Sequence, residues 1–489
     1  MPRRQWIVIT AAAVLVLAGI ALAMVFRAAP GATRDDPWAH VEKAPPPTDH
    51  RPLIQGPIAT GPDATRACLK CHATEAHDFM KTSHWTWLGR EAVIAGRSVP
   101  NRIGKRNLIN NYCISIQSNW EVCTACHAGY GWRDDTFDFT NAENIDCLVC
   151  HDQTGTYYRS YDGGTPGEDV DLTAVAQSVG RPTRSNCGYC HFKGGGGDAV
   201  KHGDLDGTFY YPDDRIDAHM GKHGFECVDC HRTERHDMVG RGASVSADAE
   251  NRLTCESCHS GAPHQNARLN THVQAVACQT CHIPRMAVAA PTKMSWDWST
   301  AGQDREENEH AYLKIKGSFE YAQNISPDYY WYNGRTQRYL MGDKIDPEGV
   351  TQLNPPEGDI HDPLARIWPF KVHRGKQVCD KVNRYFLVPK VAGEGGYWTE
   401  FDWDLALRLG SEATGLPYSG QYGFARSDMH WSITHMVATK DKALQCTDCH
   451  AENGRLEWAR LGYDGDPAYR GSPRSMTVRA GVSSGEGSR

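Results

Sequence analysis

Eight copies of one pentapeptide, C-x-x-C-H, constrain this chain of 489 residues more than any other feature. They use sixteen of its 18 cysteines. At this spacing two thiols can form thioether bonds to the vinyl groups of one haem, and the next histidine can bind the iron from the same side. The motifs therefore predict eight haem c groups. Their residues are Cys68, Cys71 and His72; Cys123, Cys126 and His127; Cys147, Cys150 and His151; Cys187, Cys190 and His191; Cys227, Cys230 and His231; Cys255, Cys258 and His259; Cys278, Cys281 and His282; and Cys446, Cys449 and His450.

Two other chemistries use paired cysteines. A structural zinc site needs two such pairs that together supply four ligands, and a thioredoxin-like redox site uses a single pair. Neither explains eight copies that all end in histidine. The haem interpretation is therefore preferred to both.

The predicted fold is a multihaem cytochrome c that is mainly α, with much irregular structure, little sheet and a core built around eight packed haems. One helix is predicted in detail, from Asp171 to Val179, because Gly180 and Pro182 stop it. The interval 283–445 lacks motifs and is rich in aromatic residues. We expect these to pack over haem faces, with substrate binding as the alternative. They are Trp296, Trp298, Tyr329, Tyr330, Trp331 and Tyr332.

The N-terminus predicts export. Arg3 and Arg4 precede an uncharged apolar run over 7–26, and Arg27 follows it. Twenty residues suffice for a membrane helix, whereas the small residues around Ala21–Ala23 suit a cleaved signal. Both alternatives place the remaining chain in the periplasm, either soluble or anchored to the inner membrane.

Motif spacing and composition divide the chain into six segments. The predicted segments are a signal peptide or anchor (1–27), a linker rich in Pro, Gly and Ala (28–66), a haem-dense region with the first seven motifs and the active site (67–287), a haem-free aromatic region (288–440), the eighth haem region (441–471) and a disordered tail (472–489).

The formal net charge of −7 argues against a nucleic-acid partner. Each haem adds two propionates, so the mature protein is expected to be more acidic. The expected partners are a redox protein or a quinol-linked electron donor, together with a small oxyanion substrate.

The motif histidines supply one axial ligand to each iron, and the opposite ligand decides whether a haem carries electrons or binds substrate. A second histidine gives a closed electron carrier. Histidines near the motifs are the predicted distal ligands: His84, His219, His236, His264, His272, His430 and His435. His77, His202 and His223 are reserves, and His40 and His50, in or near the linker, are weaker candidates.

Two stretches give the chain a family resemblance. NYCISIQSNWEVCTACHAGYGW at 111–132 and GGGGDAVKHGDLD at 194–206, together with the eight motifs, resemble the octahaem tetrathionate reductase family over about residues 66–470. In that family the second haem is catalytic, and its distal side carries a lysine, an aspartate three residues earlier and a nearby cysteine. The resemblance implies Lys201, Asp198 and Cys113 for these roles.

These residue types make chemical sense at such a site. On a helical turn Asp198 and Lys201 would share a face. A neutral Lys201 can bind iron, whereas its ammonium form can hold an anion or donate a proton. The alternative is a surface ion pair. Cys113 is predicted to be a reactive thiol, or else to form a disulfide with Cys379, the other cysteine outside the motifs.

Three functions follow from this sequence. The first is a multihaem oxidoreductase that reduces tetrathionate, nitrite or hydroxylamine at the second haem. The second is an electron-transfer or storage protein without a substrate of its own. The third is hydroxylamine oxidation. One iron without two histidine ligands would favour an enzyme, and eight bis-histidine irons would favour the carrier.

Overall fold

A computed structural model describes residues 37–113, 115–240 and 252–472. The chain divides into two compact units, Met1–Ala44 and Pro45–Arg489. The described part of the first contains one 3-10 turn, η1 (Pro37–His40). The predicted signal or anchor (1–27) and the tail beyond Ser472 lie outside the described residues. Within the described ranges, no helix is both long enough and apolar enough to cross a membrane.

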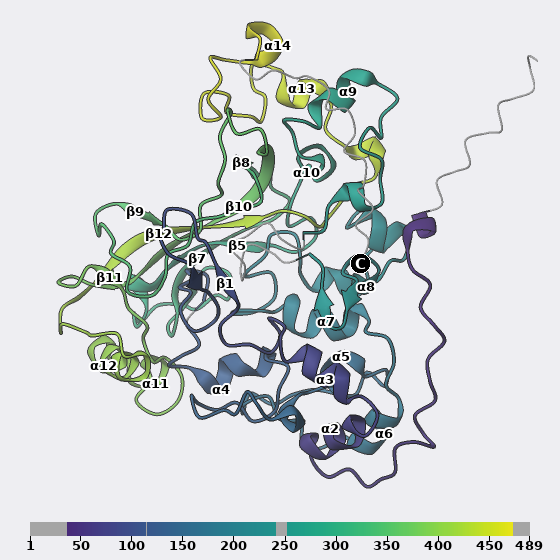
Figure 1. Ribbon diagram of the computed structural model, residues 1–489. Helices are drawn as coiled ribbons and strands as arrows, with labels where there is room; N and C mark the ends of the chain where they lie inside the picture. Colours follow the sequence, from purple (N-terminus) through teal and green to yellow (C-terminus); the bar gives the residue numbers. More distant parts are fainter. Residues whose placement is uncertain (1–36, 114, 241–251, 473–489) are drawn as a thin grey trace, which may run out of the picture. The chain divides into compact units, whose positions relative to one another are not determined.

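Short helices carry most of the haem motifs in the second unit (Figure 1). Because cysteines three residues apart share one face of a helical turn, a single turn brings both sulfurs to the same haem. The helices are α2 (Gly61–Leu69), α3 (Ala73–Phe79), α4 (Trp120–Cys123), α5 (Leu148–His151), α6 (Leu172–Gln177), α7 (Arg184–His191), α8 (Cys227–Cys230), α9 (Ala267–His272), α10 (Cys278–His282), α11 (Tyr397–Glu400), α12 (Trp403–Thr414), α13 (Cys446–Cys449) and α14 (Pro467–Arg470).

The helix expected over 171–179 is present as α6. Asp171 caps it, since its carboxylate accepts hydrogen bonds from the backbone N–H groups of Thr173 and Ala174. Leu172, Val175 and Ala176 are buried against Leu148 of α5 and Ala64 of α2. The helix thus packs two attachment helices together.

An eight-stranded sheet occupies much of the predicted haem-free region, and the expectation of little sheet was wrong. Its strands run in the order β6-β7-β5-β10-β12-β9, with β8 and β11 also paired to β10. They are β5 (Thr292–Asp297), β6 (Tyr312–Leu313), β7 (Gly317–Ala322), β8 (Asp328–Tyr332), β9 (Val350–Gln352), β10 (Arg366–Asp380), β11 (Tyr385–Phe386) and β12 (Tyr422–Ser432). Two small hairpins complete the described strands: β1 (Glu91–Ala92) with β2 (Asn101–Arg102), and β3 (Thr233–Glu234) with β4 (Asp237–Met238).

Strand β10 organises this sheet. Its 15 residues pair antiparallel with β12 from Phe370↔Ser432 to Asp380↔Tyr422 and parallel with β5 around Gly375↔Trp296. Nearly every residue of β10 is buried, as in a strand covered on both faces. Polar side chains on β10 are therefore carried into the interior.

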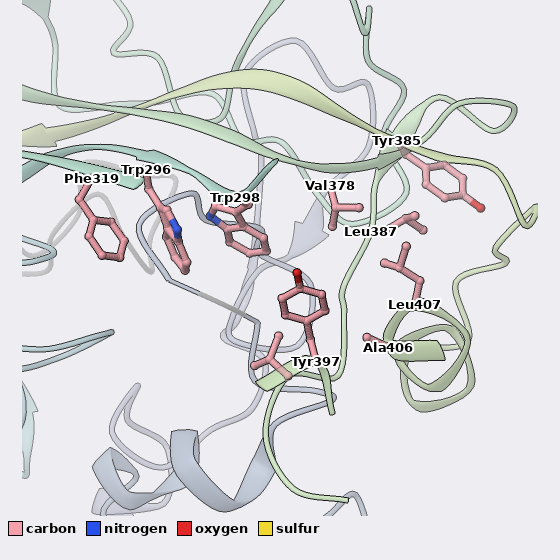
Figure 2. Close-up of a cluster of buried hydrophobic side chains, with 10 residues drawn as sticks. Trp296, Trp298, Phe319, Val378, Tyr385, Leu387, Tyr397, Ala406 and Leu407 are labelled. Carbon is pink, nitrogen blue, oxygen red and sulfur yellow. The ribbon is translucent and has the colours of Figure 1, made fainter. Parts of the chain in front are cut away.

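The aromatic residues of this region form cores around the sheet. Figure 2 shows Trp296 and Trp298 below the strands, near Tyr397, with Ala406 and Leu407 of α12 in the same cluster. Asp402 caps the start of α12, and Gly415, with φ 68°, ends it. Tyr329 and Trp331 pack in a separate cluster with residues near the eighth motif. These contacts give the sheet a protein core of its own.

Candidate haem chain and active site

Seven motif histidines each face one histidine from outside the motifs. A metal–imidazole bond is about 2.0 Å long, so two imidazoles on opposite sides of one iron have ring centres about 6 Å apart. The ring centroids lie 6.1–6.5 Å apart in every pair. The pairs are His72 with His50, His151 with His236, His191 with His84, His231 with His435, His259 with His219, His282 with His264, and His450 with His272.

This geometry fits bis-histidine haem iron. Six of the seven residues predicted as distal ligands lie in these pairs. The seventh, His430, lies on β12 with its ring against Tyr330 and Phe370. Its place is taken by His50, which sequence proximity to the motifs ranked lower.

The reserve histidines lie elsewhere. The ring of His202 packs 5.3 Å from Trp431, and His223 lies 6.5 Å from Phe225. His77 is exposed, with its Nδ1 3.8 Å from the carboxylate of Asp78. His40 lies in the first unit.

Contacts between cysteines of different motifs order the haems. The sulfurs of Cys68 and Cys147, of Cys126 and Cys190, of Cys187 and Cys227, and of Cys255 and Cys278 lie in side-chain contact. Three further pairs of these cysteines lie near each other: Cys150 with Cys190, Cys230 with Cys258, and Cys281 with Cys449.

Because each cysteine attaches a haem edge, these contacts predict which haems are neighbours. The motif order is one, three, four, five, six, seven, eight, with motif two branching from motif four. Figure 1 agrees, because α2 lies toward the bottom of the view and α10 and α13 toward the top, with α5, α7 and α8 between them. The contacts connect all eight motifs, and together with the seven histidine pairs they fit a chain of eight haems with one branch.

The second motif differs from the other seven. No described histidine ring contacts His127, which is 2% exposed. Four aromatic side chains enclose its ring at centroid distances of 4.5–5.8 Å: Trp85, Trp132, Phe137 and Phe139. Its Nε2 lies 2.7 Å from the carbonyl oxygen of Trp85, whereas its Nδ1 is buried without a hydrogen-bond partner.

A buried ion pair fixes the backbone behind this motif. Arg159 and Asp146 lie 3.1 Å apart, with fully buried side chains. The Arg159 guanidinium also donates to the carbonyl oxygens of His127 and Gly129. Removing either partner would leave an uncompensated buried charge, so the ion pair holds motif two against the start of motif three.

The glycine run brings the two family-like stretches together. Gly195, Gly196 and Gly197 have φ values of 91°, 108° and 127°, a region that favours glycine. A Cβ on Gly195 would clash with the ring of Tyr112, and one on Gly196 would lie 3.5 Å from Cys113 Sγ. The run therefore places the Lys201 loop against Cys113.

Lys201 lies beside the second motif. Its Nζ is 5.0 Å from the centre of the Trp431 ring, and it lies near Cys126 of that motif. Loss of hydration lowers the pKa of Lys201 to about 8. The neutral amine is therefore easier to reach near neutral pH than for an exposed lysine.

Asp198 does not pair with Lys201 as the helical arrangement predicted. Residues 194–199 form turns, and Ala199 has a φ of 55°, which breaks a helical path. The exposed carboxylate of Asp198 instead accepts a hydrogen bond from the backbone N–H of Gly207, 2.7 Å away. The shared face expected for Asp198 and Lys201 was wrong.

Cys113 and Cys379 are thiols in separate clusters, not a disulfide. Cys113 packs with Cys123 of the second motif against the Trp296 cluster, whereas Cys379 is buried in the cluster around Phe386. The backbone N–H of Cys113 donates to the side-chain oxygen of Asn110. Cys113 therefore lies at the second motif, and Cys379 does not.

Three lysines near this site were not predicted from the sequence: Lys293 and Lys371, which are buried, and Lys105, which is half-buried. Burial lowers the pKa of Lys105 to about 8 and that of Lys293 to about 7, and it holds the pKa of Lys371 well below its usual value. The charge of Lys105 interacts with that of Lys201, and the charge of Lys293 with Cys113. For Lys293 and Lys371 the available signal was a lone lysine within an aromatic strand, in TKMSW and WPFKV.

Comparisons with known proteins place the whole architecture. A family described as "Cytochrome c bacterial" matches residues 293–453, and "Cytochrome c7 and related cytochrome c" matches 213–283. The search of curated proteins gave no match. The crystal structure of an octaheme cytochrome c from Shewanella oneidensis is 49% identical with a TM-score of 0.81, and the alignment covers 86% of this chain and 98% of that one.

This degree of identity over nearly all of the Shewanella chain agrees with the eight motifs and the seven histidine pairs. It confirms the resemblance to an octahaem family and the expectation of eight haem c groups. The chain belongs to the octahaem c-type cytochromes, a family of electron-transfer proteins with covalently bound haem.

Proposed function

We propose that this cytochrome is a reductase that passes electrons along the haem chain to a small sulfur or nitrogen oxyanion at the second haem. One observation carries the proposal: among the described residues no histidine ring faces that of His127, whereas the other seven motif histidines each face one, and Lys201 lies near Cys126 of the same motif. The other seven haems would have two histidine ligands each and would act as electron carriers.

Positive charge supports an anionic substrate. Lys201, Lys105 and Lys293 all lie around the second motif or Cys113, and their charges reach one another or the sulfurs there. Desolvated amines attract an anion more strongly than hydrated ones because the local dielectric is low. The anions that this charge favours are tetrathionate and nitrite. Hydroxylamine, which is uncharged near neutral pH, is the third proposed substrate.

In the proposed reduction of tetrathionate, Cys113 and Lys201 have separate roles. The bound haems supply the electrons. The Cys113 thiolate attacks one inner sulfur of tetrathionate, so the central S–S bond breaks and one thiosulfate leaves. Two electrons then cleave the new Cys113–sulfur bond, which releases the second thiosulfate and restores the thiolate. Lys201 holds the sulfonate charge during both steps, and Asp198 remains a proposed member of the site from the family resemblance.

Periplasmic location and the electron source are part of the proposal. The basic N-terminus with its apolar run supports export, as a cleaved or an anchored form. The proposed donor is a redox protein or a quinol-linked donor.

Oxidation of a reduced donor dye by each substrate tests the activity. Lys201→Ala should lower the rate with tetrathionate and with nitrite by at least about tenfold, because it removes a positive charge beside an anionic substrate. Lys193→Ala is the control, since Lys193 is exposed on the same loop. A protein that oxidises hydroxylamine but reduces none of the three would support the oxidase alternative, and one that does neither would support the carrier.

A further inference from the structure

The ring nitrogen that faces away from the iron has a different partner in different haems. In four of the paired histidines, Nδ1 lies 2.8–2.9 Å from a backbone carbonyl oxygen. These are His50 with Thr48, His151 with Gly180, His231 with Val239, and His272 with Arg268. Such a bond fixes the ring and leaves Nε2 for the metal.

His450 of the eighth motif has a carboxylate in that position. Its Nδ1 lies 2.6 Å from Oδ1 of Asp466. The two side chains are 21% and 14% exposed. The ring also stacks on Trp458, with centroids 5.3 Å apart and an interplanar angle of 17°.

Few hydrogen-bond donors other than His450 contact the carboxylate of Asp466. Its Oδ1 also accepts from the backbone N–H of Ala468 at 2.8 Å, and its Oδ2 is buried without a hydrogen-bond partner. Among the described residues, two other paired histidines have a well-buried aspartate near Nδ1. Asp204 lies 3.3 Å from His435 but also accepts from the backbone N–H groups of residues 434 and 435, and Asp217 lies 3.7 Å from His219.

A carboxylate partner makes imidazole a stronger electron donor to iron than a carbonyl does. Stronger donation stabilises the ferric form more than the ferrous form, and so lowers the reduction potential. The short contact at His450 should therefore have the largest effect in this chain.

We propose that Asp466, acting through His450 as a positioning residue, gives the haem on Cys446 and Cys449 the lowest potential of the seven bis-histidine haems. This haem is at the end of the chain farthest in motif order from the second haem, and Cys446 is exposed. The low-potential end is thus opposite the candidate active site. This inference does not depend on the substrate or on the direction of electron flow.

The proposal is tested by redox titration of the wild-type and Asp466→Asn holoproteins, in which the visible absorption spectrum reports the reduction of each haem. Asparagine keeps an acceptor for His450 and Ala468 but removes the charge. The lowest of the seven bis-histidine potentials should rise by at least the equivalent of a tenfold change in the equilibrium constant, about 59 mV for one electron; a rise confined to a higher potential would contradict the proposal. Asp466→Glu should keep the low value, and Asp464→Asn, at an exposed aspartate two residues away, should change nothing.

The affected haem is identified by its ligands. His272→Ala should abolish the same electron paramagnetic resonance signal that Asp466→Asn shifts. If Asp466→Asn does not fold, Asp466→Ser supplies the neutral side chain. Eight unchanged potentials in a folded neutral variant, or a shift confined to a haem that His272→Ala leaves intact, would overturn the proposal.

Discussion

The buried side-chain amino group of Lys371 donates a hydrogen bond to the carbonyl oxygen of Val200, 2.9 Å away. It also donates to Thr292 Oγ1 at 2.6 Å and to the carbonyl oxygen of Lys201 at 3.3 Å. The single hydroxyl proton of Thr292 is shared between the carbonyl oxygens of residues 199 and 202, which lie 2.6 and 2.9 Å from Oγ1. Strands β5 and β10 therefore hold the backbone of the loop that carries Lys201.

Replacing Lys371 tests whether these hydrogen bonds position the loop that carries Lys201. Lys371→Met leaves buried carbonyl groups without donors, at about 1–3 kcal/mol for each unsatisfied group, so the loop should shift. We expect slower substrate reduction and an altered spectrum of the second haem, with the seven other haem signals intact. Lys376→Met, on the same strand at a half-exposed position, should behave as the wild type. An unaltered spectrum of the second haem in Lys371→Met would show that these hydrogen bonds are not needed to position the loop.

Burial of Lys293 should make stability depend on pH. The pKa of this amine falls from 10.5 to about 7, because the folded chain removes its hydration. Between these values the unfolded chain binds more protons, so the free energy of unfolding rises with pH.

Lys293→Met removes the buried charge. It should therefore stabilise the protein at pH 7 and below, by up to about 5 kcal/mol, and by much less near pH 10. Thermal melting at both pH values measures this, with exposed Lys381→Met as the control. An equal effect of Lys293→Met at both values would contradict the assigned shift.

Replacing His50 and replacing His430 should have opposite effects on the haem spectra. His50→Ala removes the ring across from His72, so one of the seven bis-histidine haems should become high-spin. His430→Ala removes a ring that contacts Tyr330 and Phe370, so all haem spectra should persist. Visible and electron paramagnetic resonance spectra of the two variants decide the matter. The reverse pattern would refute the pairing proposed for the first haem.

Features that depend on neighbouring residues in the sequence were predicted better than contacts between distant segments. The motifs specify their own helical turns, and the Asp171 cap, with the Gly180 and Pro182 stop, specifies α6 to within a few residues. Distal histidines depend on contacts between distant segments: His84 meets His191, and His272 meets His450. Nearness to a motif in sequence was only a partial guide to these contacts.

The sheet and its buried lysines were not predicted from the sequence for a related reason. Strand β10 is buried on both faces, so it lacks the alternation of polar and apolar residues that marks a strand. Lys371 and His373 interrupt its apolar sequence, although both are fully buried. Their partners come from loops and strands far away in sequence, and composition does not predict them.

The two cysteines outside the motifs should behave differently. Cys113→Ser should lower tetrathionate reduction at least about tenfold more than nitrite or hydroxylamine reduction, because only tetrathionate offers an S–S bond to a thiolate. Cys379→Ser should leave haem content and all activities intact, since Cys379 packs in a separate cluster. Parallel loss of stability in both variants, with activities retained, would remove Cys113 from the mechanism.

Electron paramagnetic resonance of the fully oxidised holoprotein tests the central claim most directly. The account predicts seven signals of the bis-histidine type and one distinct signal, from the haem on Cys123 and Cys126. Lys201→Ala should alter that one signal and leave the other seven in place. Eight bis-histidine signals, or a distinct signal that Lys201→Ala does not change, would contradict the assignment of the second haem as the site of reduction.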